Sequence, residues 1–171
     1  MRLIILALYL LVVALIAWKR GGRPEQVIAG IMVVNIVLDY VYHLIFGPSS
    51  FRQIDPVHLA MDTACFLLFL GVALRANRAW TLWVCAAQNI VMLGHLGKLF
   101  EVNAVLRGYW AMTQAPFYLQ LAFLALGTLA HVMRVRTIGP YNSWRPDRSV
   151  AAPFTRRPHD ERGDVLAAHR R

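Results

Sequence analysis

Long apolar runs, separated by short polar stretches, extend along the chain up to about residue 136. A helix needs about 20 apolar residues to cross a hydrocarbon core about 30 Å thick, and five of the runs are of roughly that length. They cover residues 3–18, 25–46, 56–74, 79–100 and 116–135. The pattern therefore predicts an all-α fold, in which residues 1–136 form a polytopic bundle of five transmembrane helices.

The first run differs from a cleaved signal peptide at its end. It closes with Ala17-Trp18-Lys19-Arg20, where a signal peptide has a small-residue cleavage site. We therefore expect this run to be a retained helix. Between the fourth and fifth runs, the apolar positions 102, 105, 106 and 109 have helical spacing, which predicts a short interfacial helix over 102–109.

The composition supports a membrane protein. Hydrophobic residues make up 58% of the 171 residues and charged residues 16%, with a mean hydropathy of +0.48. Soluble domains are about half apolar and about a quarter charged. A water-soluble enzyme or nucleic-acid-binding domain is therefore excluded as the main body of the chain.

The basic residues are unequally divided between the two sets of loops. One set carries Lys19, Arg20, Arg23, Arg75, Arg78, Arg134 and Arg136, and the other carries Arg2, Arg52, Lys98 and Arg107. Cytoplasmic loops are enriched in Lys and Arg, so we expect the N-terminus outside and the C-terminus in the cytoplasm. The preference for Arg over Lys, with abundant Ala, is typical of GC-rich bacterial genomes and favours a bacterial inner (cytoplasmic) membrane.

The end of the chain has a different composition. From Arg134 onward there are nine Arg residues, four acidic residues and four prolines, with few apolar residues. Such a segment cannot bury enough apolar surface to offset its ordering entropy. Residues 137–171 are therefore predicted to form a largely disordered basic tail that contacts anionic lipid of the inner leaflet. No nucleic-acid partner is expected, because the positive-inside bias explains the same charges.

Several polar residues interrupt the apolar runs, and an ionisable group at the bilayer centre costs about 2.5–3.5 kcal/mol. Helical spacing places them on single faces of the second, third and fourth helices. With the orientation given above, the Asp and His residues fall in the outer half of the bilayer. The predicted buried polar cluster consists of Asn35, Asp39, His43, His58, Asp62, Gln88 and His95.

Three interpretations of this cluster remain open. The side chains could join the helices by hydrogen bonds alone, or they could handle protons or a small solute. They could also bind a transition metal such as zinc, while a b-type haem or a pigment on one of the histidines is a further alternative. The candidate metal ligands are His43, His58, Asp62 and His95.

The sequence contains no H-E-x-x-H and no G-x-S-x-G motif, so no catalytic residues are assigned. The expected function is that of a small non-enzymatic accessory or ligand-binding subunit of a membrane complex. Its expected partners are the lipid bilayer and other membrane subunits or a second copy of the chain. A metal-dependent membrane enzyme, or a proton-coupled carrier of ions or small solutes, is the alternative.

Overall fold

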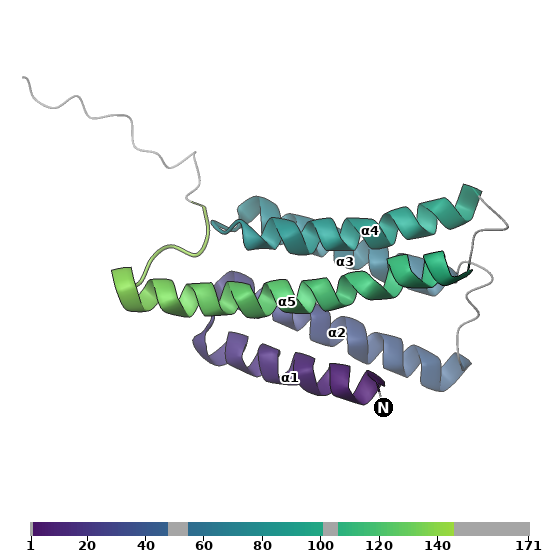
Figure 1. Ribbon diagram of the computed structural model, residues 1–171, viewed down its shortest axis with the longest axis horizontal. Coiled ribbons are helices and arrows are strands. Elements are labelled where there is room, and N and C mark those ends of the chain that lie inside the picture. The colour runs from purple at the N-terminus through teal and green to yellow at the C-terminus, as the bar shows by residue number, and fades with distance from the viewer. Residues whose placement is uncertain (1, 48–54, 101–105, 146–171) are drawn as a thin grey trace, which may run out of the picture.

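The computed structural model describes residues 2–47, 55–100 and 106–145. These residues form five α-helices and no strand, and 88% of them are helical. The helices are α1 (Arg2–Arg20), α2 (Arg23–Phe46), α3 (Pro56–Arg75), α4 (Trp80–Phe100) and α5 (Leu106–Ile138) (Figure 1). The predicted all-α class is therefore confirmed for the described part of the chain.

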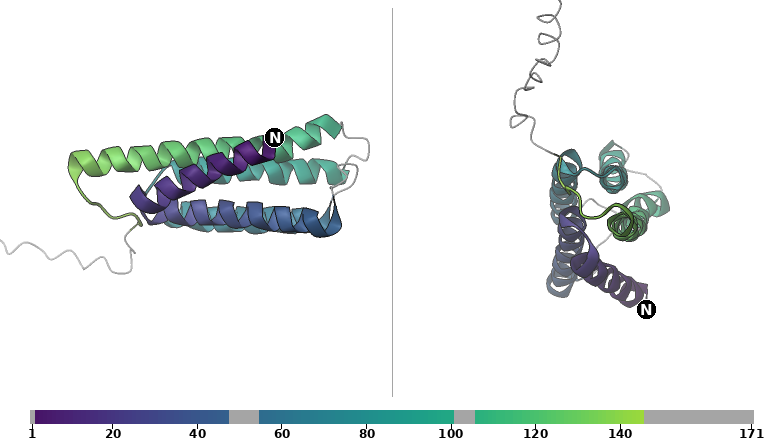
Figure 2. Two further views of the ribbon diagram at one scale, coloured as in Figure 1. Left: turned by 90° about the horizontal axis from the view of Figure 1, so that it is seen from below. Right: turned by 90° about the vertical axis from the view of Figure 1, so that its left-hand side faces the viewer.

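The helices lie side by side along one long axis, and α1 crosses the others at an angle (Figure 2). Each helix packs against the next one in the chain, and α5 also contacts α1 and α2. The turns at 21–22 and 76–79 and the segment 139–145 lie at one end, which we call the basic end. The end of α2 and the start of α3 lie at the opposite end, which we call the histidine end.

The local sequence explains where α2 ends and α3 begins. Gly47 has φ +80°, and its N–H donates to the carbonyl of His43, which closes α2. The Asp55 carboxylate accepts a hydrogen bond of 2.9 Å from the N–H of Val57, and Pro56 occupies the first helical position of α3. These capping groups fix His43 and Asp55 at the same end of the bundle.

The fifth helix is longer than the sequence suggested. Pro116 had indicated a start at residue 116, because proline favours the first turn of a helix. It lies instead inside α5, which begins at Leu106, and its side chain is buried. Proline is tolerated inside membrane helices where neighbouring groups satisfy the freed carbonyl. Residues 106–109 of the predicted interfacial helix are indeed helical, but they are the first residues of α5, and residues 101–105 lie outside the described residues.

Three helices are long and apolar enough to cross a membrane: Arg23–Phe46, Pro56–Arg75 and Gly108–Ile138. In α4 the polar residues Gln88, Asn89 and His95 interrupt the apolar run, and α4 is not among these three helices. Many large apolar side chains point outward from the bundle, as expected of a surface that faces lipid. The structure is therefore consistent with a membrane protein.

Close packing joins α4 to α5. A Cβ atom added to Gly127 would lie 2.4 Å from Cδ2 of Trp80, so the indole of Trp80 lies directly on the backbone of α5. A Cβ atom added to Gly94 would likewise lie 3.0 Å from Cβ of Met112. Small residues at such contacts allow membrane helices to approach closely.

The segment after α5 folds back onto the turn between α3 and α4. Gly139, with φ +82°, follows the end of α5, and the backbone N–H of Asn77 then donates to the carbonyl of Ser143 at 3.1 Å. The N–H of Arg145 donates to the carbonyl of Arg75 at 2.9 Å. The first residues of the predicted basic tail, up to residue 145, are therefore attached to the turn by backbone hydrogen bonds, and residues 146–171 lie outside the described residues.

Candidate metal centre

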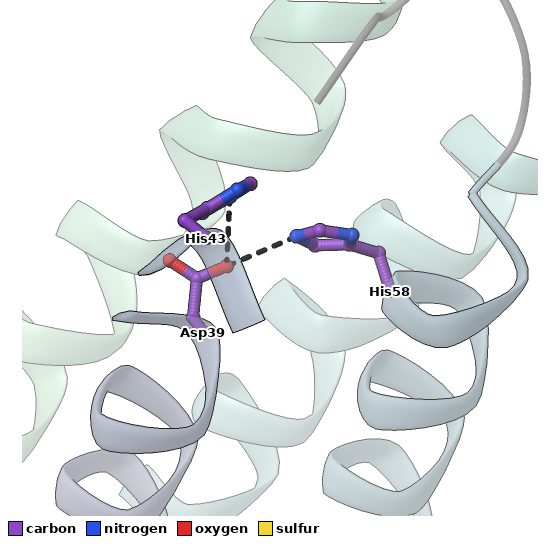
Figure 3. A group of neighbouring side chains, drawn as sticks. All are labelled: Asp39, His43 and His58. Carbon is purple, nitrogen blue, oxygen red and sulfur yellow. Dashed lines mark hydrogen bonds and ion pairs between the residues drawn. The ribbon is translucent and has the colours of Figure 1, made fainter. Parts of the chain in front are cut away.

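Three potential metal ligands converge at the histidine end (Figure 3). Asp39 and His43 lie one turn apart on α2, and His58 lies in the first turn of α3. Oδ1 of Asp39 is 3.0 Å from Nε2 of His58 and 3.6 Å from Nε2 of His43. One ligand atom from each residue lies within 4.8 Å of the other two, and no other such trio of His, Cys, Asp or Glu occurs in the described part of the chain.

The Nδ1 atom of each histidine has a separate oxygen partner. Nδ1 of His43 lies 2.8 Å from the carbonyl oxygen of Gly47, which can only accept a hydrogen bond, so this nitrogen carries the proton. Nδ1 of His58 lies 3.0 Å from Oδ2 of Asp55. That contact is out of line for a hydrogen bond and is an ion-pair contact. Both Nε2 atoms are thereby directed toward Asp39.

A positive charge would stabilise this arrangement, either as a second proton on His58 or as a bound cation. With its proton on Nδ1, His43 directs an Nε2 lone pair at the carboxylate of Asp39, and lone pair and carboxylate repel each other. His58 lies between two carboxylates, so at least one proton or cation must accompany each of its nitrogens. Histidines that bind metals have the same form: one nitrogen faces the metal, and the other donates to a carbonyl or carboxylate.

Two of the three distances between ligand atoms also fit a small ion. Zinc–nitrogen and zinc–oxygen bonds of about 2.0–2.1 Å give ligand atoms about 3.3 Å apart at the corners of a tetrahedron. The two distances from Oδ1 of Asp39, 3.0 and 3.6 Å, lie on either side of that value. The side chains of Asp39, His43 and His58 are 42%, 31% and 22% exposed. A partly exposed set of three ligands leaves a fourth position for water or a small ligand.

Asp55 supports the site from outside the trio. Burial raises the pKa of its carboxyl group, but hydrogen bonds from Tyr42 Oη and the Val57 N–H, together with the contact to His58, outweigh burial and lower the pKa below its ordinary value. Asp55 is therefore a carboxylate at neutral pH. Its charge lies beside Nδ1 of His58, while Nε2 of the same ring faces Asp39.

A second polar network lies deeper in the bundle and joins α3, α4 and α5. Oδ2 of Asp62 is 2.8 Å from Nε2 of His95, and Nδ1 of His95 is 3.0 Å from the hydroxyl of Tyr109. The amide of Gln88 donates to Oδ1 of Asp62 at 3.2 Å and accepts from Gln120 at 2.7 Å. His95, Gln88, Tyr109 and Gln120 are buried. Such a network satisfies buried polar groups and sets the register of the helices.

The predicted set of four metal ligands is therefore divided between two places. His43 and His58 belong to the trio, together with Asp39, which the sequence had placed in the polar cluster but not among the ligands. Asp62 and His95 belong to the deeper network, in which Gln88 also takes part. The correction has a geometric reason: helical spacing shows which residues share a face, but not which neighbouring helix each part of that face meets.

Other residues differ from their sequence-based interpretation. Asn35 is half-buried on α2, and its side chain makes no hydrogen bond to any described residue. Tyrosine is enriched at membrane interfaces, and Tyr42 and Tyr109 lie near predicted span ends in the sequence. In the structure they are hydrogen-bonding partners of Asp55 and His95. Nothing in the sequence around Tyr42, one residue before His43, distinguishes a tyrosine of the membrane interface from one that hydrogen-bonds to another side chain.

A third polar contact, which sequence reasoning missed, lies at the basic end. Nη1 of Arg78 lies 2.6 Å from Oε1 of Glu25, and both side chains are buried. Nη2 of Arg78 donates to Oγ of Ser143 at 3.2 Å, and its guanidinium lies 5.1 Å from the ring centre of Tyr141. The absence of a side chain at Gly22 leaves room for the guanidinium, because a Cβ there would lie 2.7 Å from Nη2 of Arg78. The sequence had suggested only a helix start at Glu25 and a loop charge at Arg78.

Comparison of the chain with protein-family models, curated proteins and solved structures gave no significant match.

Proposed function

We propose that this chain is an integral membrane protein that binds a divalent transition-metal ion of the zinc class through Asp39, His43 and His58. The observation that carries the proposal is the matched orientation of the two imidazoles. Nδ1 of His43 lies against the carbonyl oxygen of Gly47, Nδ1 of His58 lies beside the Asp55 carboxylate, and both rings direct Nε2 toward the same carboxylate oxygen of Asp39. Zinc accepts imidazole and carboxylate ligands in a tetrahedral arrangement with an open position.

Chemistry favours a metal over hydrogen bonding alone. Nε2 of His58 is within hydrogen-bonding distance of Oδ1 of Asp39, but Nε2 of His43 lies 3.6 Å from the same oxygen, too far for a hydrogen bond, and a cation would satisfy both atoms. Magnesium and calcium prefer oxygen ligands, whereas imidazole suits zinc and the neighbouring first-row metals. The trio lies at the end of the bundle, where an ion can arrive from water.

We further propose that all five helices cross the membrane, with the basic end in the cytoplasm and the histidine end outside. The supporting observation is that Arg75, Arg78, Arg134 and Arg136 all fall at the same end of the described bundle. Such a protein in a bacterial inner membrane would act as a metal-binding subunit, alone or beside other membrane proteins. No catalytic role is needed to explain the site.

The direct test is the metal content of the full-length protein purified in mild detergent, after dialysis against zinc and then metal-free buffer. We expect about one zinc ion per chain, measured by elemental analysis. Asp39→Asn, His43→Ala and His58→Ala should each reduce this content to background. His131→Ala is the matched control, because His131 lies on α5 at the basic end, and it should retain the metal.

Two results would overturn the proposal. One is wild-type protein that is folded and monodisperse but takes up no zinc, cobalt, nickel or copper. The other is stoichiometric zinc that persists in both His43→Ala and His58→Ala. A far-UV spectrum unchanged from wild type would show that loss of metal in a variant is not loss of fold.

A further inference from the structure

A shallow depression lies at the basic end, between the last turn of α3 and the segment after α5. Its volume is about 550 Å³, and Leu74, Arg75, Trp144 and Arg145 line it. We propose that this depression binds the phosphate headgroup of an anionic phospholipid. The inference rests on the membrane orientation proposed above, but it does not depend on the metal site.

The two arginines are brought together by a defined backbone contact. The N–H of Arg145 donates to the carbonyl of Arg75 at 2.9 Å, and the neighbouring residues Ala76 and Trp144 form an antiparallel bridge. Both arginine side chains are exposed. Guanidinium groups bind phosphate oxygens in pairs, so two on adjacent backbones can contact one phosphate from two sides.

The segment that carries Arg145 is firmly attached to the bundle. Ser143 bonds to Arg78 through its hydroxyl and to Asn77 through its carbonyl. The Tyr141 ring lies between the guanidiniums of Arg78 and Arg134, 5.1 and 4.7 Å from its centre. The depression is therefore built by the fold, and its arginines do not belong to a free basic tail.

The surrounding charge favours an anion. Among the described residues, Glu25 is the only acid at the basic end, and Arg78 neutralises it. The guanidiniums of Arg75 and Arg145 have no carboxylate partner in the described part of the chain, so their charge is available to a ligand.

The apolar residues of the depression favour a lipid over a free phosphate ion. Leu74 is exposed beside Arg75, and Trp144 is half-buried against the core. Tryptophan is enriched at the level of lipid headgroups. A phospholipid could place its phosphate on the arginines and its glycerol and first methylenes on Leu74. Basic pockets on the cytoplasmic side of membrane proteins bind anionic headgroups in this way.

The test is a titration of full-length protein in mild detergent with phosphatidylglycerol, with bound lipids counted by native mass spectrometry. We expect one tight phosphatidylglycerol per chain and no equivalent phosphatidylcholine. Arg75→Gln/Arg145→Gln should weaken this binding by roughly 30-fold, because each basic residue contributes about a factor of five. The charge-matched control is Arg23→Gln/Arg136→Gln, which removes two exposed arginines at the same end and should change the affinity less than threefold.

Three outcomes would overturn the inference. Equal weakening in the two double variants would show that binding follows overall charge and no discrete site. Equal binding of phosphatidylcholine would show that the acyl chains alone are recognised. Displacement of the lipid by inorganic phosphate at equal concentration would show that the depression takes a free anion. Zinc content measured on the same samples separates this inference from the metal site, because Arg75→Gln/Arg145→Gln should leave it unchanged.

Discussion

Nε2 of His58 lies 3.0 Å from Oδ1 of Asp39, and this contact joins the first turn of α3 to the last two turns of α2. The two residues are 19 positions apart in the sequence. The Asp39 carboxylate is also the group to which His43 turns its Nε2 atom. One carboxylate oxygen is therefore the centre of the candidate site, and the surrounding residues set the direction of both imidazoles.

Asp55→Asn should weaken zinc binding by about 10- to 100-fold without unfolding α3. A carboxylate behind a metal-binding histidine typically contributes that much to affinity. Asparagine also caps helices well, so the cap that Asp55 provides to Val57 should persist. The affinity is measured by competition with a zinc-sensitive dye. Unchanged affinity in Asp55→Asn would show that Asp55 does not orient His58.

The lowered pKa of Asp55 defines the pH range over which its charge stabilises the folded protein. Because its folded pKa is lowered, its ionised form stabilises the native state above its ordinary pKa of 3.8, and this stabilisation is lost as the pH falls through the lower folded value. Loss of zinc between pH 7 and pH 5 therefore reflects protonation of the histidine ligands and not of Asp55. Asp55→Asn should move the midpoint of that loss to higher pH, because the more weakly bound zinc competes less well with protons for the histidines, as measured by metal content against pH.

His95→Ala should destabilise the bundle but leave the zinc content near one per chain. The substitution removes the partner of Oδ2 of Asp62 and opens a cavity among α3, α4 and α5. An unsatisfied buried group costs about 1–3 kcal/mol. Unfolding in denaturant-containing micelles measures the change in free energy. If His95→Ala lost its zinc while keeping its fold, the division of the predicted ligands into two places would be incorrect.

Removing one member of the buried pair Glu25 and Arg78 should destabilise the protein strongly, whereas replacing both members by apolar residues should destabilise it much less. Glu25→Gln should lower the free energy of unfolding by about 3–5 kcal/mol, because it leaves the guanidinium buried without its counter-charge. Glu25→Leu/Arg78→Met should recover much of that loss. Oε2 of Glu25 and Nε of Arg78 have no hydrogen-bond partner among the described residues, so the pair is only partly satisfied.

The control for this pair is Arg23→Gln, which removes an exposed arginine from the start of the same helix and should change stability by no more than about 0.5 kcal/mol. Equal effects of Arg23→Gln and Glu25→Gln would show that the ion pair contributes nothing specific. Release of the segment 139–145 in Glu25→Gln, seen as faster hydrogen exchange at the backbone amides of Asn77 and Arg145, is a second expected result.

Gly127→Ala should loosen the contact between α4 and α5. The added methyl would lie 2.4 Å from the Trp80 ring, so one of the two helices must shift, at about 1–3 kcal/mol. Gly97→Ala is the control, because a Cβ there meets nothing within 4 Å. Alanine has the higher helix propensity, so Gly97→Ala should be neutral or slightly stabilising. Thermal unfolding in detergent distinguishes the two, and equal melting temperatures would contradict the packing at Trp80.

Local patterns predicted the elements well and their contacts less well. The apolar runs, together with the helix-breaking residues Pro24, Gly47 and Pro56 at their ends, predicted the bounds of α2 and α3 to within a residue or two. Pro116 misled because it lies inside α5 and not at its start. The same limit applies to the site: spacing placed Asp39 and His43 on one face of α2, but the choice of His58 over His95 as their partner depends on how the helices pack.

The basic end shows the same limit more strongly. Arg78 belongs to a short polar turn and has the sequence signature of a cytoplasmic loop charge. Its burial against Glu25 depends on the absence of a side chain at Gly22 and on the return of Ser143, 65 residues later. A contact between residues so far apart in the sequence leaves no local pattern. Sequence reasoning therefore could not distinguish a paired arginine from a solvated one.

X-ray absorption at the zinc edge of the loaded full-length protein tests the metal site most directly. The site predicts four nitrogen or oxygen ligands at about 2.0–2.1 Å, with the scattering of two imidazoles and no sulfur. His43→Ala in excess zinc should show one imidazole if any metal remains. A spectrum without imidazole scattering, or with two imidazoles that persist in both His43→Ala and His58→Ala, would contradict the assignment of Asp39, His43 and His58 as the metal ligands.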